Sequence, residues 1–283
     1  MKILIIGGSR FVGPLIISKL IERGHDVTVF NRGKIKSEYN NLKFIQGNRN
    51  EGFNIKERFD VVIDTCAYKG IHTEKAISEL NFDFYLNFGT AASYKKTNKF
   101  PLTEESEIGD WPYWKDYNKG KVECENVLRN SDVKYATIRP VYILGKNNYM
   151  NREKFIYSKI KNNEEIILPG NGQALIQFVF AEDVANSIVL LAEKRIAGDF
   201  NCCSDEVITL KGLVEEMGKI VGIKPIIKFN HNNDGDKFDE NEFPFANENF
   251  FCTNEKLKNL GIKFTILSDG LEEDYKNYYK KVI

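Results

Sequence analysis

Short apolar runs alternate with stretches of helical spacing through the first half of the chain. The apolar runs have the length of buried strands, and they are Lys2–Ile6, Asp26–Phe30, Lys43–Gln46, Val61–Asp64, Phe84–Phe88 and Tyr135–Ile138. The stretches between them that repeat apolar residues with the helical period are 11–23, 72–80 and 117–129. Strands that alternate with helices predict an α/β fold, with a doubly wound parallel sheet covered by helices on both faces.

The second half of the chain departs from this alternation. A polar insertion around one helix covers residues 147–172, and strand and helix patterns return at Phe178–Phe180 and Glu182–Glu193. After residue 203 the pattern changes again, with helical stretches at Leu210–Val221 and 269–281. We therefore expect a nucleotide-binding domain made of residues 1–145 and 173–203. Residues 146–172 and 204–283 are expected to form a smaller substrate-binding lobe.

Composition narrows the classes of partner. Lys+Arg and Asp+Glu both total 40, so the net charge is zero. Proteins that coat nucleic acid usually carry an excess of basic residues, which this chain lacks. The alternative is a local basic patch that binds nucleic acid. We expect no signal peptide, and the sequence has no apolar run of the roughly 18 residues that a membrane helix needs. The 5 cysteines form no C-x-x-C pair and the 3 histidines lie far apart, so we expect no metal site and a reducing, cytoplasmic location.

A glycine-rich stretch, GGSRFVG, joins the first strand to the first helix. Gly7 and Gly8 suit a tight turn, and Gly13 suits close packing of helix on strand. Helix N-termini of this kind bind the pyrophosphate of a dinucleotide. We therefore predict a Rossmann-type fold and a cofactor contact along the whole loop, which comprises Gly7, Gly8, Ser9, Arg10, Phe11, Val12 and Gly13. The alternative is an ordinary strand–helix turn.

The end of the second strand indicates which dinucleotide is bound. NAD sites usually place a carboxylate there for the ribose hydroxyls, but this chain has Asn31, Arg32 and Lys34 at that point. Together with Arg10, these cations could hold a 2′-phosphate through charge-assisted hydrogen bonds. We therefore expect NADP(H) to be favoured over NAD(H). The alternative is that these cations are only solvated surface residues.

Tyr117 and Lys121 are spaced so that both side chains share one helix face. A free tyrosine has a pKa near 10, and a neighbouring ammonium group favours the phenolate that can act as a base. The chemistry also needs a hydroxyl group that polarises the substrate oxygen, and Thr90 follows the strand Phe84–Phe88. These three residues are the predicted catalytic set.

The chain resembles the extended short-chain dehydrogenase/reductase superfamily, and in particular the NAD-dependent epimerase/dehydratase family. The resemblance rests on GGSRFVG, FNRGK, NFGTAASY, YNKGKVECE, IRPVYILG and QFVFAEDVANSI. It implies that Tyr117 is the acid/base, that Thr90 polarises the substrate, and that Lys121 contacts the cofactor ribose and assists Tyr117. Further cofactor contacts are implied for Asn31, Asn48, Arg49, Cys66 and Ala67, although packing is the favoured interpretation of Cys66.

The resemblance also implies a small-molecule substrate, such as a nucleotide-sugar, and a homodimer. The sugar-nucleotide dehydratases place Asp-Glu directly after the hydroxyl residue, where this chain has Ala91 and Ala92. Dehydration by that route is therefore not expected. The usual aspartate near the adenine is replaced by Asn48.

A narrower similarity links the chain to the chloroplast stem-loop RNA-binding proteins and their bacterial relatives. It rests on NRGK, RPVYILG with NNYMNREKF, and FPFANENFF. It implies an alternative function, in which an RNA-binding or regulatory protein retains a vestigial or sensing nucleotide site. A structural partner without a ligand is a third option. Because Tyr117 and Lys121 are both present, we favour an oxidoreductase or epimerase that works by hydride transfer.

Several other side chains have two interpretations each. Arg139 either lines the substrate pocket or forms a structural ion pair. Tyr142 could reach the pocket, although packing in the core is favoured. Asp183 could take part in catalysis, although capping of the helix that begins there is favoured. Trp111, Tyr113 and Trp114 either shape a substrate lid or fill a hydrophobic seam.

Overall fold

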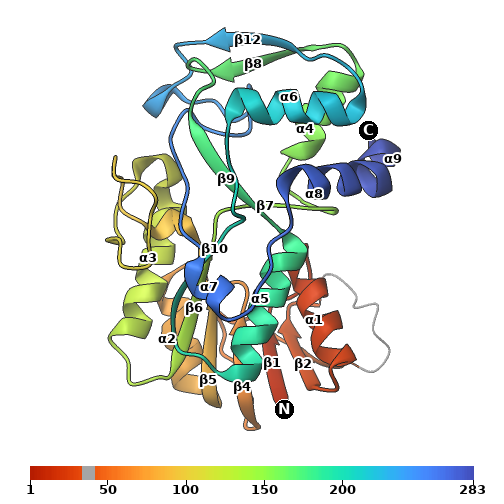
Figure 1. The fold of residues 1–283 in the computed structure, drawn as a ribbon. Coiled ribbons are helices and arrows are strands. Elements are labelled where there is room, and N and C mark those ends of the chain that lie inside the picture. Colours follow the sequence, from red (N-terminus) through yellow and green to blue (C-terminus); the bar gives the residue numbers. More distant parts are fainter. Residues whose placement is uncertain (34–41) are drawn as a thin grey trace.

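The computed structural model describes residues 1–33 and 42–283, and a seven-stranded sheet forms one end of the molecule (Figure 1). Its strands are β1 (Lys2–Ile6), β2 (Asp26–Asn31), β3 (Lys43–Gln46), β4 (Arg58–Asp64), β5 (Asn81–Phe88), β6 (Tyr135–Pro140) and β10 (Gly198–Cys202). The strand order is β10-β6-β5-β4-β1-β2-β3, and every adjacent pair is parallel. The predicted Rossmann-type α/β fold is confirmed.

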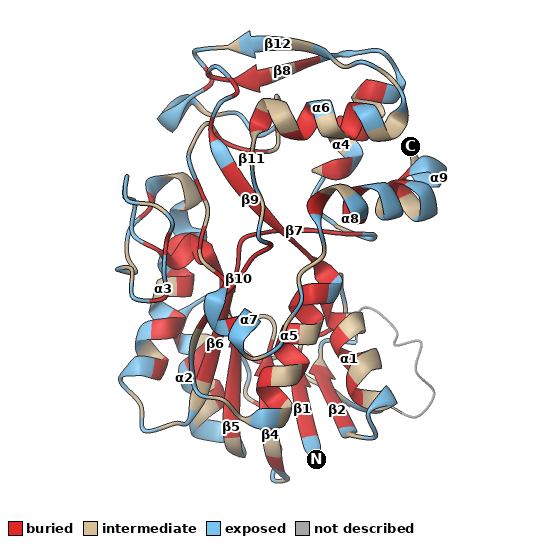
Figure 2. Ribbon diagram, in the orientation of Figure 1, coloured by how far each residue is buried: buried red, intermediate tan, exposed pale blue. Residues whose placement is uncertain are grey.

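Helices cover both faces of this sheet because alternate strand residues point to opposite sides. They are α1 (Val12–Glu22), α2 (Gly70–Glu79), α3 (Lys115–Arg129) and α5 (Ala181–Lys194). Ile3 and Ile5 of β1 belong to the apolar cluster that contains α1 and α5, whereas Leu4 and Ile6 face the cluster that contains residues of α2 and α3. Figure 2 shows the strands buried between these layers. No helix in the described ranges is long and apolar enough to cross a membrane.

The remaining elements form the other end of the molecule (Figure 1). They are β7 (Tyr142–Leu144), α4 (Glu153–Lys161), β8 (Glu165–Pro169), β9 (Leu175–Phe180), β11 (Val207–Thr209), α6 (Leu210–Val221), β12 (Ile226–Asn230), α7 (Glu255–Asn259), α8 (Leu267–Asp274) and α9 (Lys280–Val282). Short 3₁₀ turns lie at Ala91–Ser93, Pro112–Trp114 and Gly235–Lys237, and a π-helical turn, Tyr275–Tyr279, joins α8 to α9. The single helix expected over 269–281 is therefore divided into three parts.

Two small sheets organise this second end. β9 lies between β11 and β7, and β12 pairs with β8. β9 falls within residues 173–203, which we assigned to the nucleotide-binding domain, but it pairs outside the seven-stranded sheet. The next strand, β10, returns to the edge of the large sheet beside β6. The chain between residues 173 and 203 thus connects the two ends of the molecule, and our division into two domains stays a prediction.

The prediction for Asp183 was wrong. α5 begins at Ala181, and Phe180 occupies the N-cap position without a side-chain cap from any described residue. The Asp183 carboxylate instead accepts hydrogen bonds from the backbone N–H and the hydroxyl of Thr265, at 2.8 and 3.1 Å. Asp183 therefore connects α5 to the segment that leads into α8.

Candidate functional site

A cleft of about 1810 Å³ lies at the carboxyl ends of the parallel strands. Its walls come from the loops after β1, β2, β3, β4 and β5, from the start of α3, and from residues 140–155 and 235–250 of the other end of the molecule. Ligands of open α/β sheets bind where the strand order reverses, here beside β1. Pockets for one small ligand usually measure about 300–1000 Å³, so this cleft has room for a dinucleotide and a second molecule.

The glycine loop forms the floor of this cleft. Gly7 and Gly8 have φ of 93° and 73°, in the left-handed region that glycine tolerates best. At Gly13 a Cβ atom would lie 2.5 Å from the carbonyl carbon of Gly8, so only glycine allows this approach of helix to loop. No side chain among the described residues caps the N-terminus of α1. Gly13 N donates to Arg10 O at 2.9 Å and Pro14 has no N–H, so an anion at this end would be held by the helix dipole and the Val12 N–H group.

The end of β2 lies next to this loop. Asn31 Nδ2 donates to Gly7 O and to Ser9 Oγ, at 3.3 and 3.0 Å, and Asn31 Oδ1 accepts from Gly33 N at 2.8 Å. The position where NAD sites carry an acid is thus filled by a neutral amide that holds the loop. Arg10 and Arg32 line the cleft with exposed side chains and form no ion pair with another described residue. Lys34, the third predicted cation, lies outside the described residues.

The loops after β3 and β4 carry the remaining predicted cofactor residues, and only some of these are free to contact a ligand in the cleft. Asn48 lines the cleft, and its Nδ2 donates to Glu51 at 2.9 Å. Arg49 also borders the cleft, but its guanidinium forms a buried ion pair with both oxygens of Asp64, at 2.8 and 2.7 Å. Cys66 lines the cleft, whereas Ala67 is fully buried and is not part of the wall.

Burial and the charge of Arg49 set the protonation of Asp64 and Cys66, which lie beside and in the wall of the cleft. Burial by itself would raise the pKa of Asp64, but the adjacent Arg49 guanidinium outweighs it and holds that pKa below its ordinary value. Burial raises the pKa of Cys66 to about 11, so its thiol stays protonated at neutral pH. The Arg49–Asp64 pair is therefore a rigid support beneath the cleft. A direct contact of Arg49 or Ala67 with a cofactor remains a prediction that this geometry does not favour.

The three predicted catalytic residues line the same cleft. Thr90 follows β5 and is 9% exposed, and its Oγ1 accepts a hydrogen bond from Ala92 N at 3.2 Å. That bond leaves the Thr90 hydroxyl proton free to point to a ligand. Tyr117 in α3 is 41% exposed, whereas Lys121 is only 2% exposed. Lys121 Nζ donates to Phe88 O at 2.8 Å and lies 5.9 Å from the centre of the Tyr117 ring.

Aromatic side chains form the wall opposite the cofactor loops. Tyr113 and Trp114 line the cleft, and the Trp114 ring packs on Tyr142 and Phe250 with centroids 5.7 and 5.4 Å apart. Tyr142 is buried and also borders the cleft, so both of its interpretations hold. Trp111 is buried behind this wall. Burial raises the pKa of Tyr113 to about 12, so its hydroxyl acts as a hydrogen-bonding group and not as a base.

Arg139 is a structural residue. It is fully buried, and its guanidinium bonds to Glu125, to Asp199 and to the Tyr94 hydroxyl. It does not line the cleft. Of the two interpretations, the ion pair is the one that the structure supports.

The sequence analysis missed several residues that the fold brings to the cleft. Tyr68 lies with its ring centre 4.9 Å from Lys121 Nζ. Lys96 Nζ donates to Glu248 at 2.7 Å, which joins the segment after β5 to the segment 243–250. Arg152, at the start of α4, also reaches the cleft. Tyr149, Arg152 and Phe155, which line the cleft, lie in the NNYMNREKF stretch, but no spacing rule marks them as site residues.

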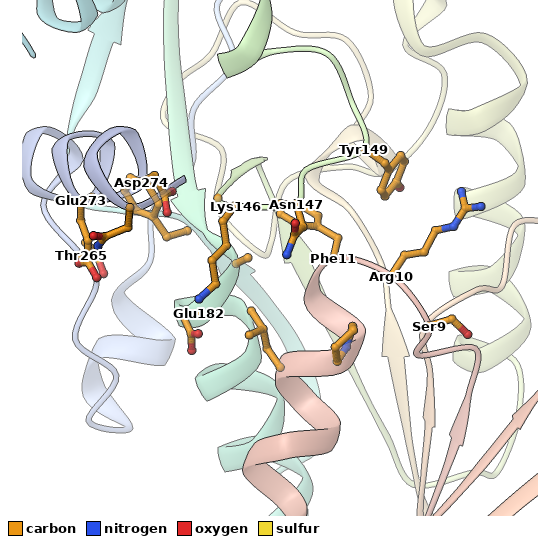
Figure 3. A pocket seen from close by; sticks show the side chains of 17 residues that line it. Ser9, Arg10, Phe11, Lys146, Asn147, Tyr149, Glu182, Thr265, Glu273 and Asp274 are labelled. Carbon is orange, nitrogen blue, oxygen red and sulfur yellow. The ribbon is translucent and has the colours of Figure 1, made fainter. Parts of the chain in front are cut away.

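A smaller pocket of about 440 Å³ lies behind the glycine loop (Figure 3). Ser9, Arg10, Phe11 and Tyr149 border both this pocket and the main cleft. Figure 3 shows Lys146 extending toward Glu182, with Glu273 and Asp274 of α8 on the far side. Burial, together with the charge of Glu273, raises the pKa of Asp274 to about 6. No group of three or more His, Cys, Asp or Glu side chains in the described ranges is placed to hold a metal ion.

A dinucleotide-type cleft on a doubly wound sheet defines a broad class of proteins, and comparison with known proteins gives the family. The model of the NAD dependent epimerase/dehydratase family matches residues 3–80 and 74–203. The chain therefore belongs to this family, as its sequence motifs predicted.

Two relatives illustrate the range of similarity. The chain is 31% identical over 299 residues to the chloroplast stem-loop binding protein of 41 kDa b of Arabidopsis thaliana, and the match covers 97% of this chain and 78% of that protein. It is 23% identical over 179 residues to the UDP-glucose 4-epimerase of Lactobacillus helveticus, covering 52% of this chain and 53% of that protein.

Two solved structures share the fold. The UDP-glucose 4-epimerase of Thermotoga maritima, solved with UDP-glucose, has a TM-score of 0.78 and 18% identity, with 100% of both chains covered. The UDP-glucuronic acid 4-epimerase of Bacillus cereus, solved with NAD, has a TM-score of 0.79 and 18% identity, with 100% of this chain and 99% of that chain covered. At this level of identity the similarity establishes the fold alone.

Proposed function

We propose that this protein is an NADP(H)-dependent oxidoreductase or epimerase, which acts by hydride transfer at a carbinol or carbonyl carbon of a nucleotide-sugar or a similar small molecule. The observation that carries this proposal is that Thr90, Tyr117 and Lys121 line the same cleft as the glycine loop. A hydroxyl, a phenol and an ammonium group thus surround one space beside a dinucleotide site. We further propose that residues 146–172 and 204–283 supply the substrate side of that space.

The residues present fit a dinucleotide. The uncapped start of α1 and the left-handed Gly7 and Gly8 suit a pyrophosphate, and Asn31, Arg10 and Arg32 lie where the adenosine ribose would be held. When bound, the nicotinamide would supply or accept the hydride. Lys121, fixed by Phe88 O, would contact the adjacent ribose.

Side chains of this protein transfer the proton that leaves or joins the substrate oxygen during the reaction. Tyr117, whose side chain is exposed in the cleft, gives or takes the proton of the reacting substrate oxygen. Thr90 donates a hydrogen bond to the same oxygen and so stabilises the charge that develops on it. Ala91 and Ala92 follow Thr90 and offer no carboxylate for proton transfer at a neighbouring carbon. This supports oxidation, reduction or epimerisation over dehydration.

Cofactor selectivity gives the direct test. Arg32 is exposed and unpaired among the described residues, so it can bind a 2′-phosphate that NAD lacks. We expect the purified protein to bind NADP(H) more tightly than NAD(H). Loss of one charge-assisted hydrogen bond costs about 1.5–3 kcal/mol, so Arg32→Ala should weaken NADP(H) by about ten- to a hundredfold and leave NAD(H) nearly unchanged. Isothermal titration calorimetry measures the affinities of the wild type and the variant for both cofactors.

Arg58→Ala is the matched control, because this exposed arginine pairs with Asp83 away from the cleft. It should change neither affinity. An equal loss of both cofactors in Arg32→Ala would contradict the proposed selectivity, and failure of the wild-type protein to bind either cofactor would contradict the proposed function.

A second candidate function is RNA binding, which the stem-loop binding relative with 31% identity favours. Zero net charge makes a large phosphate-binding surface less favourable, so we expect any RNA affinity to fall steeply with salt. Tight stem-loop RNA binding that survives moderate salt, in a protein without cofactor affinity, would favour this candidate instead.

A further inference from the structure

Three arginines stand apart from the others in their electrostatic environment. Six arginines form ion pairs with carboxylates, namely Arg23, Arg49, Arg58, Arg129, Arg139 and Arg195. Arg10, Arg32 and Arg152 form none with any described residue, and all three line the main cleft. Arg10 and Arg32 lie at the cofactor end. Arg152 comes from the opposite end of the molecule, at the N-cap of α4.

Arg152 is held in place by aromatic rings and not by a carboxylate. Its guanidinium carbon lies 4.9 Å from the centre of the Tyr142 ring and 5.7 Å from that of Phe245. Its Nε is buried and has no hydrogen-bond partner in the part of the chain that is described. Both rings belong to the packed aromatic wall, with centroids 5.0 Å apart. The guanidinium is thus oriented by stacking, and its donors form no hydrogen bond to another residue within the described ranges.

Two carboxylates of this region are already engaged in other hydrogen bonds. Glu248 lines the same cleft but accepts hydrogen bonds from Lys96 and from Trp111 Nε1. Glu153, next to Arg152 in the chain, accepts from Gly145 N and Asn148 Nδ2, at 2.8 and 2.9 Å. A cation that is partly removed from water without a counterion is unfavourable. An anionic ligand would relieve this cost.

We propose that Arg152 is a specificity-determining residue that binds an oxyanion of the substrate, either a phosphate or a carboxylate. The inference rests on the proposed function and narrows its substrate class to molecules that carry such a group. Planar guanidinium groups match two oxygens of a phosphate or carboxylate at once. Neutral sugars and alcohols are then poor substrates, because they leave the Arg152 donors unpaired.

Binding of two probes to the protein tests this assignment and separates the two sources of the oxyanion. UDP presents phosphates, and glucuronate presents a carboxylate. Each is titrated by calorimetry into wild-type protein, with and without saturating NADP⁺. We expect at least one of them to bind, and Arg152→Gln should weaken that binding by about ten- to a hundredfold. Arg152→Lys keeps the charge but loses the planar donor pair. Its affinity for the probe should therefore lie between those of the wild type and Arg152→Gln.

Arg58→Gln serves as the matched control and should bind the probe as the wild type does. Retained NADP⁺ affinity and unchanged circular dichroism show that Arg152→Gln is folded. Binding of neither probe, or equal binding to wild type and Arg152→Gln, would overturn the assignment. Titrations without NADP⁺ keep the two proposals apart: a protein that binds no cofactor contradicts the proposed function, while loss of probe binding in Arg152→Gln alone still supports the role of Arg152.

Discussion

At the scale of single residues, Lys121 shows how the fold holds a buried cation in the place that its proposed role requires. A lysine that is 2% exposed and without a carboxylate partner in the described chain is costly to bury. Phe88 O at the end of β5 and the Tyr68 ring offset part of that cost. The ammonium is thereby held at a fixed point between the sheet and α3. Its contact with the Tyr117 ring follows from the helical spacing of the two residues.

Tyr117 carries the prediction at this scale. Tyr117→Phe removes the hydroxyl but keeps the ring, so the fold and cofactor binding should persist. With a substrate in hand, kcat should fall by about 10²–10⁴-fold, which is the usual contribution of general acid–base catalysis. Steady-state kinetics on cofactor-saturated enzyme measures the change.

The matched control is Tyr68→Phe, which removes a hydroxyl from the same cleft while keeping the ring over Lys121. We expect it to retain most of the turnover. Full activity in Tyr117→Phe, or a larger loss in Tyr68→Phe, would remove Tyr117 from the acid/base role.

At the scale of elements, the junction of β1 with α1 determines the geometry of the cofactor end. Gly8 N donates to Thr65 Oγ1 at 2.9 Å, and Thr65 Oγ1 donates in turn to Ile6 O at 2.8 Å. The loop after β4 therefore holds the glycine loop in place. Close packing at Gly13 then directs the first turn of α1 into the cleft.

Gly13→Ala tests this arrangement. The added Cβ would lie 2.5 Å from the Gly8 carbonyl carbon, so α1 must shift away from the loop. Overpacking of this kind typically costs about 1–3 kcal/mol, and the shift should also weaken dinucleotide binding. Urea unfolding and calorimetry measure the two effects.

Gly24→Ala is the control, because Gly24 has φ of 78° but nothing within 4 Å of its Cβ position. It should cost about 1–2 kcal/mol of stability from backbone strain alone and leave the cofactor affinity unchanged. Unaltered cofactor affinity in Gly13→Ala would mean that the loop does not need this close approach.

At the scale of the whole molecule, Glu153 connects the cleft to the C-terminal end of the chain. Its carboxylate holds Gly145 and Asn148, which begin the segment that carries Tyr149 and Arg152 to the cleft. Tyr279, in the π-helical turn after α8, donates to Gly145 O at 3.0 Å. The position of the segment from Gly145 to Arg152 thus depends on the packing of the last helices.

Glu153 also makes stability depend on pH. Burial raises its pKa from 4.5 to about 7, although the bond from Gly145 N opposes this. The folded protein therefore keeps this proton at a pH where the unfolded chain has lost it, so the free energy of unfolding falls as the pH rises from 4.5 to 7. The shift corresponds to roughly 3 kcal/mol. In Glu153→Gln this part of the decline should disappear.

Urea unfolding at several pH values between 4.5 and 8 gives the comparison. The exposed Glu255→Gln is the control and should follow the wild-type curve. Parallel curves for wild type and Glu153→Gln would contradict the assignment of this titration to Glu153.

Local patterns in the sequence determined the fold class and one end of the site. The alternation of apolar runs and helical stretches predicted β1 to β6 and their helices, because strand and helix periods are properties of consecutive residues. The glycine loop and the pair Tyr117/Lys121 were found for the same reason. Each is defined within one turn or one helix, and the parallel topology brings them to the same edge of the sheet.

Tertiary structure alone decided the rest. Asp183 bonds to Thr265 and not to its own helix end, and Arg139 pairs with Glu125 of α3 instead of reaching the cleft. Arg152 lies on Tyr142 and Phe245, which are 10 and 93 residues away in the chain. These contacts join segments whose separation in sequence has no period, so burial, pairing and the absence of a counterion become visible only when the two ends of the molecule meet.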